Sequence, residues 1–180
     1  MPMNKKIQRS NILLTGFMGT GKSTVGLLLS EKLSKEFIDT DQVIEDLYGP
    51  ITEIFAKEGE DVFRLREREV SQQLSQRENL VIATGGKLLL DPVNVELLSA
   101  NGRIFCLRTP LKEIIKRLRE EENLGQRPLL NSNNFEEHIE ELFEARESAY
   151  GAFEQVDTAG YSPSEIAMEI GNRILSEDDS

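Results

Sequence analysis

The chain has 180 residues, of which 38% are hydrophobic and 29% charged, as is typical of a soluble globular protein with one domain. The formal net charge of −11 argues against general binding to nucleic acids or anionic membranes. The single cysteine, Cys106, excludes an intrachain disulfide and a cysteine-based metal cage, and the single histidine, His138, argues against a histidine-based catalytic triad.

In chain order, short apolar runs alternate with helical patterns of apolar residues. Strands are predicted at residues 11–15, 37–38, 80–83 and 103–107, and a last short strand is predicted to end at residues 156–157. Helices are predicted at about residues 25–33, 42–47, 52–57, 60–76, 92–100, 111–119 and 135–153, and from Pro163 onward. The alternation predicts an α/β fold, a parallel five-stranded sheet with helices on both faces.

The polar stretch at about residues 120–134 contains Gly125, Pro128 and four asparagines, and it is predicted to form a mobile lid. The acidic residues at about 176–180 are predicted to form a frayed tail. The sequence has no internal repeat and no linker, so residues 1–180 are expected to form one domain.

Three segments of unusual composition, residues 16–23, 39–41 and 84–87, directly follow predicted strands. In open parallel sheets, ligands bind beyond the carboxyl ends of the strands. We therefore expect these segments to meet at one edge of the sheet and to form the functional site there.

The first of these segments, Gly16-Phe-Met-Gly-Thr-Gly-Lys-Ser23, fits the phosphate-binding pattern G-x-x-x-x-G-K-[ST] between a strand and a helix. Its glycines let successive backbone N–H groups cradle phosphate oxygens, and the helix adds its positive N-terminal end. Lys22 is predicted to reach the β- and γ-phosphates, and the Ser23 hydroxyl to bind Mg²⁺. The predicted nucleotide-binding residues here are Gly19, Thr20, Gly21, Lys22, Ser23 and Thr24.

The remaining motifs indicate which kind of phosphate-loop protein this is. The chain has no Asn-Lys-x-Asp motif for guanine recognition, and no obvious apolar strand late in the sequence ends in a metal-binding aspartate. Asp39 and Asp41, after the second strand, are the better candidates for the metal and substrate carboxylates. This combination is typical of a small phosphotransferase.

Three arginines have both a structural and a functional interpretation. Arg146 lies within the apolar stripe of its helix, where it either forms an internal ion pair or binds an anionic ligand. Arg64 lies three residues before Glu67 at the edge of an apolar face, either as a surface ion pair or as an arginine held to receive a carboxylate. Arg127, in the predicted lid, is either solvated or closes over a phosphoryl group.

The chain resembles the shikimate kinases, which share the phosphate-loop fold of nucleoside-monophosphate kinases, over about residues 11–174. The resemblance rests on the phosphate loop, Phe37-Ile-Asp-Thr-Asp41, Ile54-Phe55 followed by Gly59-Glu60 and Phe63-Arg64-x-x-Glu67, Gly85-Gly86, Arg127-Pro-Leu-Leu130 and Arg146-x-x-x-Tyr150. It implies ATP-dependent phosphorylation of the 3-hydroxyl of shikimate in the biosynthesis of aromatic amino acids.

The resemblance also implies residue roles. Asp41 would bind the substrate hydroxyls and act as the base, and Asp39 would hold Mg²⁺ through water. Arg64 and Arg146 would grip the substrate carboxylate. The loop at Gly85 and Gly86, through the Gly86 amide, would contact the substrate, and Arg127 would close over the phosphates of ATP.

Three positions depart from the family pattern. Lys87 follows Gly85-Gly86 where the family usually has a third glycine, which a side chain can replace if φ is negative. Lys87 either strengthens binding of a carboxylate or phosphate or indicates a different substrate. In addition, the segment between Asp41 and Arg64 is one residue short, and the adenine-side turn at residues 157–161 lacks an arginine often found there, which predicts weaker nucleotide binding.

Two other functions are open at this stage. One is a kinase of the same fold that acts on another small polyol or hydroxy acid, similar to gluconate. The other is a non-catalytic nucleotide-binding regulatory module, which is disfavoured because Lys22, Ser23, Asp39, Asp41 and Arg127 are all present.

No stretch approaches the roughly 20 apolar residues of a membrane span, and the first residues lack the apolar core of a signal peptide. We therefore expect a cytoplasmic monomer with a small-molecule substrate and without nucleic-acid or membrane partners.

Overall fold

The computed structural model describes residues 10–123 and 134–176, with side chains described to residue 120 in the first range. Its elements follow the chain as β1 (Asn11–Thr15), α2 (Lys22–Leu33), β2 (Glu36–Asp39), α3 (Thr40–Tyr48), α4 (Ile51–Lys57), α5 (Glu60–Ser75), β3 (Leu80–Ala83), the short 3₁₀ helix η1 (Leu88–Leu90), α6 (Pro92–Ser99), β4 (Gly102–Arg108), α7 (Leu111–Asn123), α8 (Phe135–Tyr150), β5 (Glu154–Asp157) and α9 (Pro163–Ser176). None of the described helices is long and apolar enough to cross a membrane.

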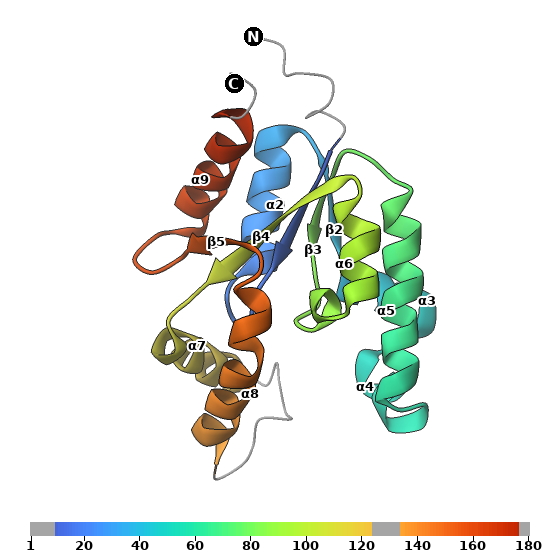
Figure 1. Cartoon of the computed structure of the whole chain (residues 1–180). Helices are drawn as coiled ribbons and strands as arrows, with labels where there is room; N and C mark the ends of the chain where they lie inside the picture. The colour runs from blue at the N-terminus through green and yellow to red at the C-terminus, as the bar shows by residue number, and fades with distance from the viewer. Residues whose placement is uncertain (1–9, 124–133, 177–180) are drawn as a thin grey trace.

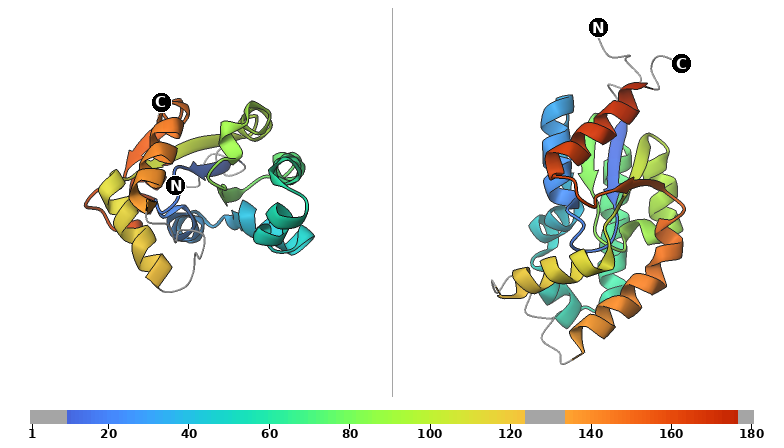
Figure 2. Two further views of the ribbon diagram at one scale, coloured as in Figure 1. Left: turned by 90° about the horizontal axis from the view of Figure 1, so that it is seen from below. Right: turned by 90° about the vertical axis from the view of Figure 1, so that its left-hand side faces the viewer.

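The strands form one parallel sheet in the order β2-β3-β1-β4-β5. Figure 1 shows this sheet between helices, and the right-hand view of Figure 2 places α2 and α6 on opposite sides of the strands. The fold class predicted from the sequence is therefore confirmed.

Strand β1 explains why helices cover both faces, because its side chains alternate between two cores. Ile12 and Leu14 pack with α2 and α9, whereas Leu13 packs with α3, α5 and α6. All three side chains are at most 1% exposed. A third cluster joins Phe17, just after β1, to α7 and α8. Strand β1 is thus held by packing on both faces, and the loop beyond it is held by α7 and α8.

The register of the strands brings their carboxyl ends together. Asp39 at the end of β2 pairs with Ala83 at the end of β3, and Leu14 of β1 pairs with the same residue. The backbone N–H of Thr84 donates to the Leu14 carbonyl at 3.0 Å. The segments that follow β1, β2 and β3 therefore meet at one edge, as the sequence predicts.

The amino end of β1 and the carboxyl end of α9 lie at the other end of the molecule, away from these loops (Figure 1).

Two helix ends differ from the sequence prediction. Helix α8 ends at Tyr150 rather than near residue 153, whereas β5 ends at Asp157, as predicted. Helix α7 continues to Asn123, so the predicted lid at about residues 120–134 overlaps the end of a helix. The rest of that lid up to residue 133, Arg127 and the tail beyond Ser176 lie outside the described residues.

Candidate active site

The loop after β1 has the backbone that its glycines predict. Gly16, Gly19 and Gly21 have φ values of 136°, 76° and 89°, in the region that side chains disfavour. A Cβ atom at Gly16 would also lie 2.6 Å from the Leu107 carbonyl oxygen of β4. The chain therefore turns sharply beside the sheet and enters α2 at Lys22.

Lys22 and Ser23 lie at the start of α2, where the positive end of the helix dipole favours an anion. The Lys22 Nζ donates to the carbonyls of Gly16 at 2.8 Å and Phe17 at 2.9 Å, across the loop. The Ser23 hydroxyl donates to Asp39 Oδ2 at 2.6 Å. A hydroxyl and a carboxylate at a phosphate loop fit Mg²⁺, which takes most of its ligands from water and phosphates.

Residues 39–41 join β2 to α3. Asp39 Oδ1 caps α3 by accepting from the Asp41 backbone N–H at 3.1 Å. Thr40 is fully buried, and its hydroxyl accepts from the Gly85 backbone N–H at 2.8 Å. Burial raises the pKa of Asp41, the neighbouring Asp39 carboxylate adds to this rise, and Lys22 opposes it. Asp41 is thus a stronger base than an exposed aspartate.

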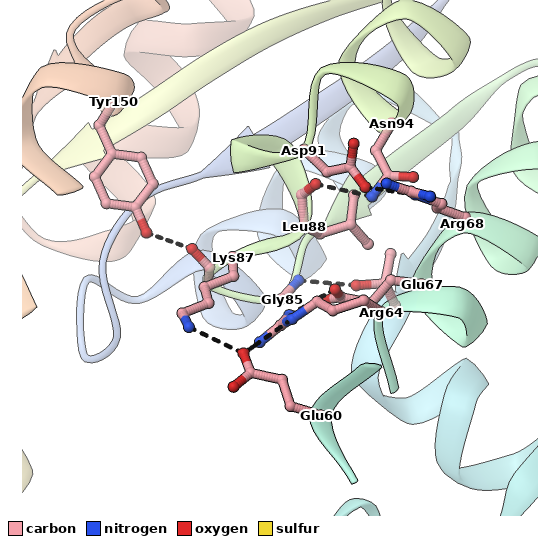
Figure 3. Close-up of polar contacts among 12 residues, drawn as sticks. Glu60, Arg64, Glu67, Arg68, Gly85, Lys87, Leu88, Asp91, Asn94 and Tyr150 are labelled. Carbon is pink, nitrogen blue, oxygen red and sulfur yellow. Dashed lines mark hydrogen bonds and ion pairs between the residues drawn. The ribbon is translucent and has the colours of Figure 1, made fainter. Parts of the chain in front are cut away.

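Arg64 in α5 is held by two carboxylates. Its Nη1 lies 2.6 Å from Oε2 of Glu67, which is 2% exposed, and its Nη2 lies 2.9 Å from Oε1 of Glu60 (Figure 3). Burial raises the pKa of Glu67, and Arg64 counteracts that rise. The Arg64 guanidinium is therefore fixed in direction at the wall of the pocket.

The loop after β3 fits closely between these groups. A Cβ atom at Gly85 would lie 2.5 Å from Asp41 Oδ1, and one at Gly86 would lie 3.7 Å from Arg146 Nη1. The Tyr150 hydroxyl donates to the Gly86 carbonyl (Figure 3). The Arg146 guanidinium lies 5.5 Å from the centre of the Phe17 ring in the phosphate loop. Helix α8 thus contacts both loops.

These groups surround one pocket of about 610 Å³. The predicted site residues that line it are Gly19, Gly21, Lys22, Ser23, Thr24, Asp39, Asp41, Arg64, Gly85, Gly86 and Arg146. Thr20 does not line the pocket, because it is 2% exposed and its hydroxyl donates to the Phe17 carbonyl at 2.8 Å. Arg127 lies outside the described residues.

Sequence reasoning assigned no role to several other lining residues, among them Glu60, Ile51 and Phe55. Glu60 stands in the Gly59-Glu60 motif, which was a signal for the family but not for a contact. Phe55 stands in the Ile54-Phe55 motif, which likewise was a signal for the family but not for a contact, and Ile51 lies one helical turn before it in α4.

The phosphate loop, the Ser23–Asp39 pair, the carboxylate of Asp41 and two arginines share one pocket at the carboxyl edge of the sheet. This arrangement defines a phosphate-loop kinase that acts on a small molecule. Residues 18–175 match the sequence model of the shikimate kinase family, and the chain belongs to that family.

Known relatives agree with this assignment. The shikimate kinase of Thermodesulfovibrio yellowstonii is 44% identical over 162 residues, which are 89% of this chain and 92% of the relative. The solved structure of the Acinetobacter baumannii shikimate kinase in complex with shikimate matches with a TM-score of 0.85 and 37% identity, over 95% of this chain and 96% of the other. A gluconokinase from Sinorhizobium meliloti shares the fold, with a TM-score of 0.62 and 20% identity over 94% of each chain.

Proposed function

We propose that this chain transfers the γ-phosphoryl group of ATP to the 3-hydroxyl of shikimate, giving shikimate 3-phosphate and ADP in the biosynthesis of aromatic amino acids. The observation that carries the proposal is that the phosphate loop, Asp41, Arg64 and Arg146 line the same pocket. Membership of the shikimate kinase family and the likeness to a shikimate kinase solved with shikimate support this substrate.

On the nucleotide side, the loop N–H groups and Lys22 would bind the β- and γ-phosphates. Gly19, Thr20, Gly21 and Thr24 complete the proposed nucleotide site. Ser23 and Asp39 would hold Mg²⁺, which neutralises phosphate charge when it is bound. Arg127, which lies outside the described residues, is assigned to the ATP phosphates from the family resemblance.

On the acceptor side, Arg64 and Arg146 would bind the carboxylate, and the loop at Gly85 and Gly86 would position the ring. The oxygen of the 3-hydroxyl would bond to the γ-phosphorus of ATP as the bond from that phosphorus to ADP breaks. Asp41 would accept the proton that this hydroxyl loses. The raised pKa of Asp41 suits this role, because a base is most effective when its pKa approaches the working pH.

The first experiment is a coupled assay of ADP release with MgATP, with and without shikimate, and with gluconate as the competing acceptor. We expect strong stimulation by shikimate and none by gluconate. Lys22→Ala is the matched inactive variant, with kcat lowered at least about 100-fold because a preorganised charge on the phosphates is lost.

A protein that binds MgATP but is not stimulated by shikimate would contradict the substrate assignment. Stimulation by gluconate alone would favour the other acceptor. ATP binding without stimulation by any acceptor would favour a regulatory module. A monomeric, cytoplasmic protein with one domain over residues 1–180, and with no nucleic-acid or membrane partner, stays a prediction.

A further inference from the structure

Lys87 and Glu60 approach each other across the acceptor side of the pocket. Lys87 follows the Gly85-Gly86 loop and precedes η1, and Glu60 is the first residue of α5. The backbone of Lys87 has φ −108° and ψ −6°, which a residue with a side chain adopts without strain. The Lys87 Nζ donates to Glu60 Oε1 at 3.0 Å (Figure 3).

The same Glu60 oxygen also accepts from Arg64, from Nε at 3.2 Å and from Nη2 at 2.9 Å. The Nε and Nη2 groups form one edge of the guanidinium, the edge that binds a carboxylate through two parallel hydrogen bonds. Nη1 is already bonded to Glu67. Glu60 therefore occupies the edge of Arg64 that a substrate carboxylate would use, and it does so with a single oxygen.

The two carboxylates on Arg64 differ in their freedom to move. The Glu67 side chain is 2% exposed, whereas the Glu60 side chain is 51% exposed. A carboxylate that leaves Arg64 needs another cation nearby, because the positive and negative side chains that line the pocket are equal in number. The described lining residues include four carboxylates (Asp39, Asp41, Glu60 and Glu67) and four cations (Lys22, Arg64, Lys87 and Arg146), so removal of Lys87 would leave an excess negative charge.

We propose that Glu60 is an exchangeable carboxylate that holds the substrate edge of Arg64 in the empty enzyme, and that Lys87 retains Glu60 when the shikimate carboxylate replaces it. The proposal rests on the proposed function. Exchange is favourable because the substrate supplies two oxygens to this edge, where Glu60 supplies one. Lys87 is thus a positioning residue that acts on substrate binding through Glu60.

The test compares Lys87→Met, Glu60→Gln and the double variant with the wild-type enzyme. Lys87→Met should raise KM for shikimate roughly three- to fivefold, which corresponds to the loss of a partly exposed ion pair, with kcat and KM for MgATP changed by less than about twofold. Glu60→Gln should lower KM for shikimate about twofold, because an amide competes less strongly for Arg64.

The double variant decides the mechanism. If Lys87 acts through Glu60, adding Glu60→Gln to Lys87→Met should return KM for shikimate to within about twofold of wild type. Lys87→Arg should also keep KM near wild type, because the positive charge is retained. The matched control is Lys57→Met, which removes an exposed lysine paired with Glu53 outside the pocket.

A double variant as impaired as Lys87→Met would overturn the proposal, because Lys87 would then contact the substrate directly. An unchanged KM in Lys87→Met, an increased KM in Glu60→Gln, or an equal effect of Lys57→Met would also overturn it. Failure of the proposed function is separate, because it would appear as absent shikimate stimulation in the wild-type enzyme before any variant is compared.

Discussion

Burial raises the pKa of Asp41, and the neighbouring Asp39 carboxylate adds to this rise, so its surroundings disfavour the charged form. As a base, Asp41 is active only when it is deprotonated. Activity should therefore rise with pH through its pKa, and the midpoint of the acidic limb should lie above the ordinary value of 3.8. A profile of kcat/KM for shikimate against pH measures this midpoint.

Replacement of Asp41 by asparagine keeps the shape of the side chain but removes the base. We expect kcat to fall at least about 100-fold while MgATP still binds. The acidic limb assigned to Asp41 should also disappear from the residual activity. A variant with nearly normal kcat would show that Asp41 only positions the substrate.

Arg146 lines the pocket from α8, beside the Phe17 ring and the Gly86 backbone. Arg146→Ala should raise KM for shikimate about 10- to 100-fold with a smaller change in kcat, as expected when a charged hydrogen bond to the substrate is lost. Arg146→Lys should lie between this variant and wild type, because it keeps the charge but not the planar fork. Normal kinetics in Arg146→Ala would remove this residue from the site.

At the scale of elements, the start of α3 and the loop after β3 are joined by one buried hydrogen bond, from Gly85 N–H to the Thr40 hydroxyl. Thr40→Val keeps the shape but leaves this N–H without its partner. We expect a loss of about 1–3 kcal/mol in the free energy of unfolding, measured by urea denaturation. Thr52→Val, on the exposed surface of α4, is the control and should change little.

If Thr40→Val is as stable as the control, the hydrogen bond between Gly85 and Thr40 does not hold the start of α3 to the loop after β3. If it is less stable, KM for shikimate should rise as well, because Asp41 and Gly85 lose their common anchor.

The sequence predicts elements well where the signal is local. The phosphate loop is contiguous, and α5 shows helical periodicity over nearly its whole length. The 3₁₀ turn at Leu88–Leu90 was not predicted, because three apolar residues have no periodicity. Helix α8 stops at Tyr150 because Gly151 is its C-cap and β5 must begin at Glu154, a constraint set by the sheet.

Separation along the chain also decides which contacts of the site can be predicted from the sequence. Arg64 and Glu67 are one helical turn apart, so their pairing can be predicted from spacing. Glu60 and Lys87 are 27 residues apart, and only the packing of α5 beside the β3 loop brings them together. The hydroxyl of Tyr150 reaches Gly86 over a still longer separation in the chain.

At the scale of the whole molecule, Cys106 reports on the integrity of the core. It is 2% exposed, and burial raises the pKa of its thiol to about 11. Alkylation at pH 8 should be at least about 100-fold slower in the native protein than in urea, because the thiolate is scarce and inaccessible. MgATP and shikimate should slow it further, since β4 packs against the phosphate loop at Gly16. Equal labelling in native and denatured protein would contradict this prediction.

The start of β1 and the end of α9 lie at the end of the molecule opposite the loops that line the pocket (Figure 1). If the protein is immobilised on a surface or fused to a partner beyond either position, the mouth of the pocket should therefore stay open to diffusing substrates. The same placement suits circular permutation, since a linker between these two ends would not cross the catalytic edge.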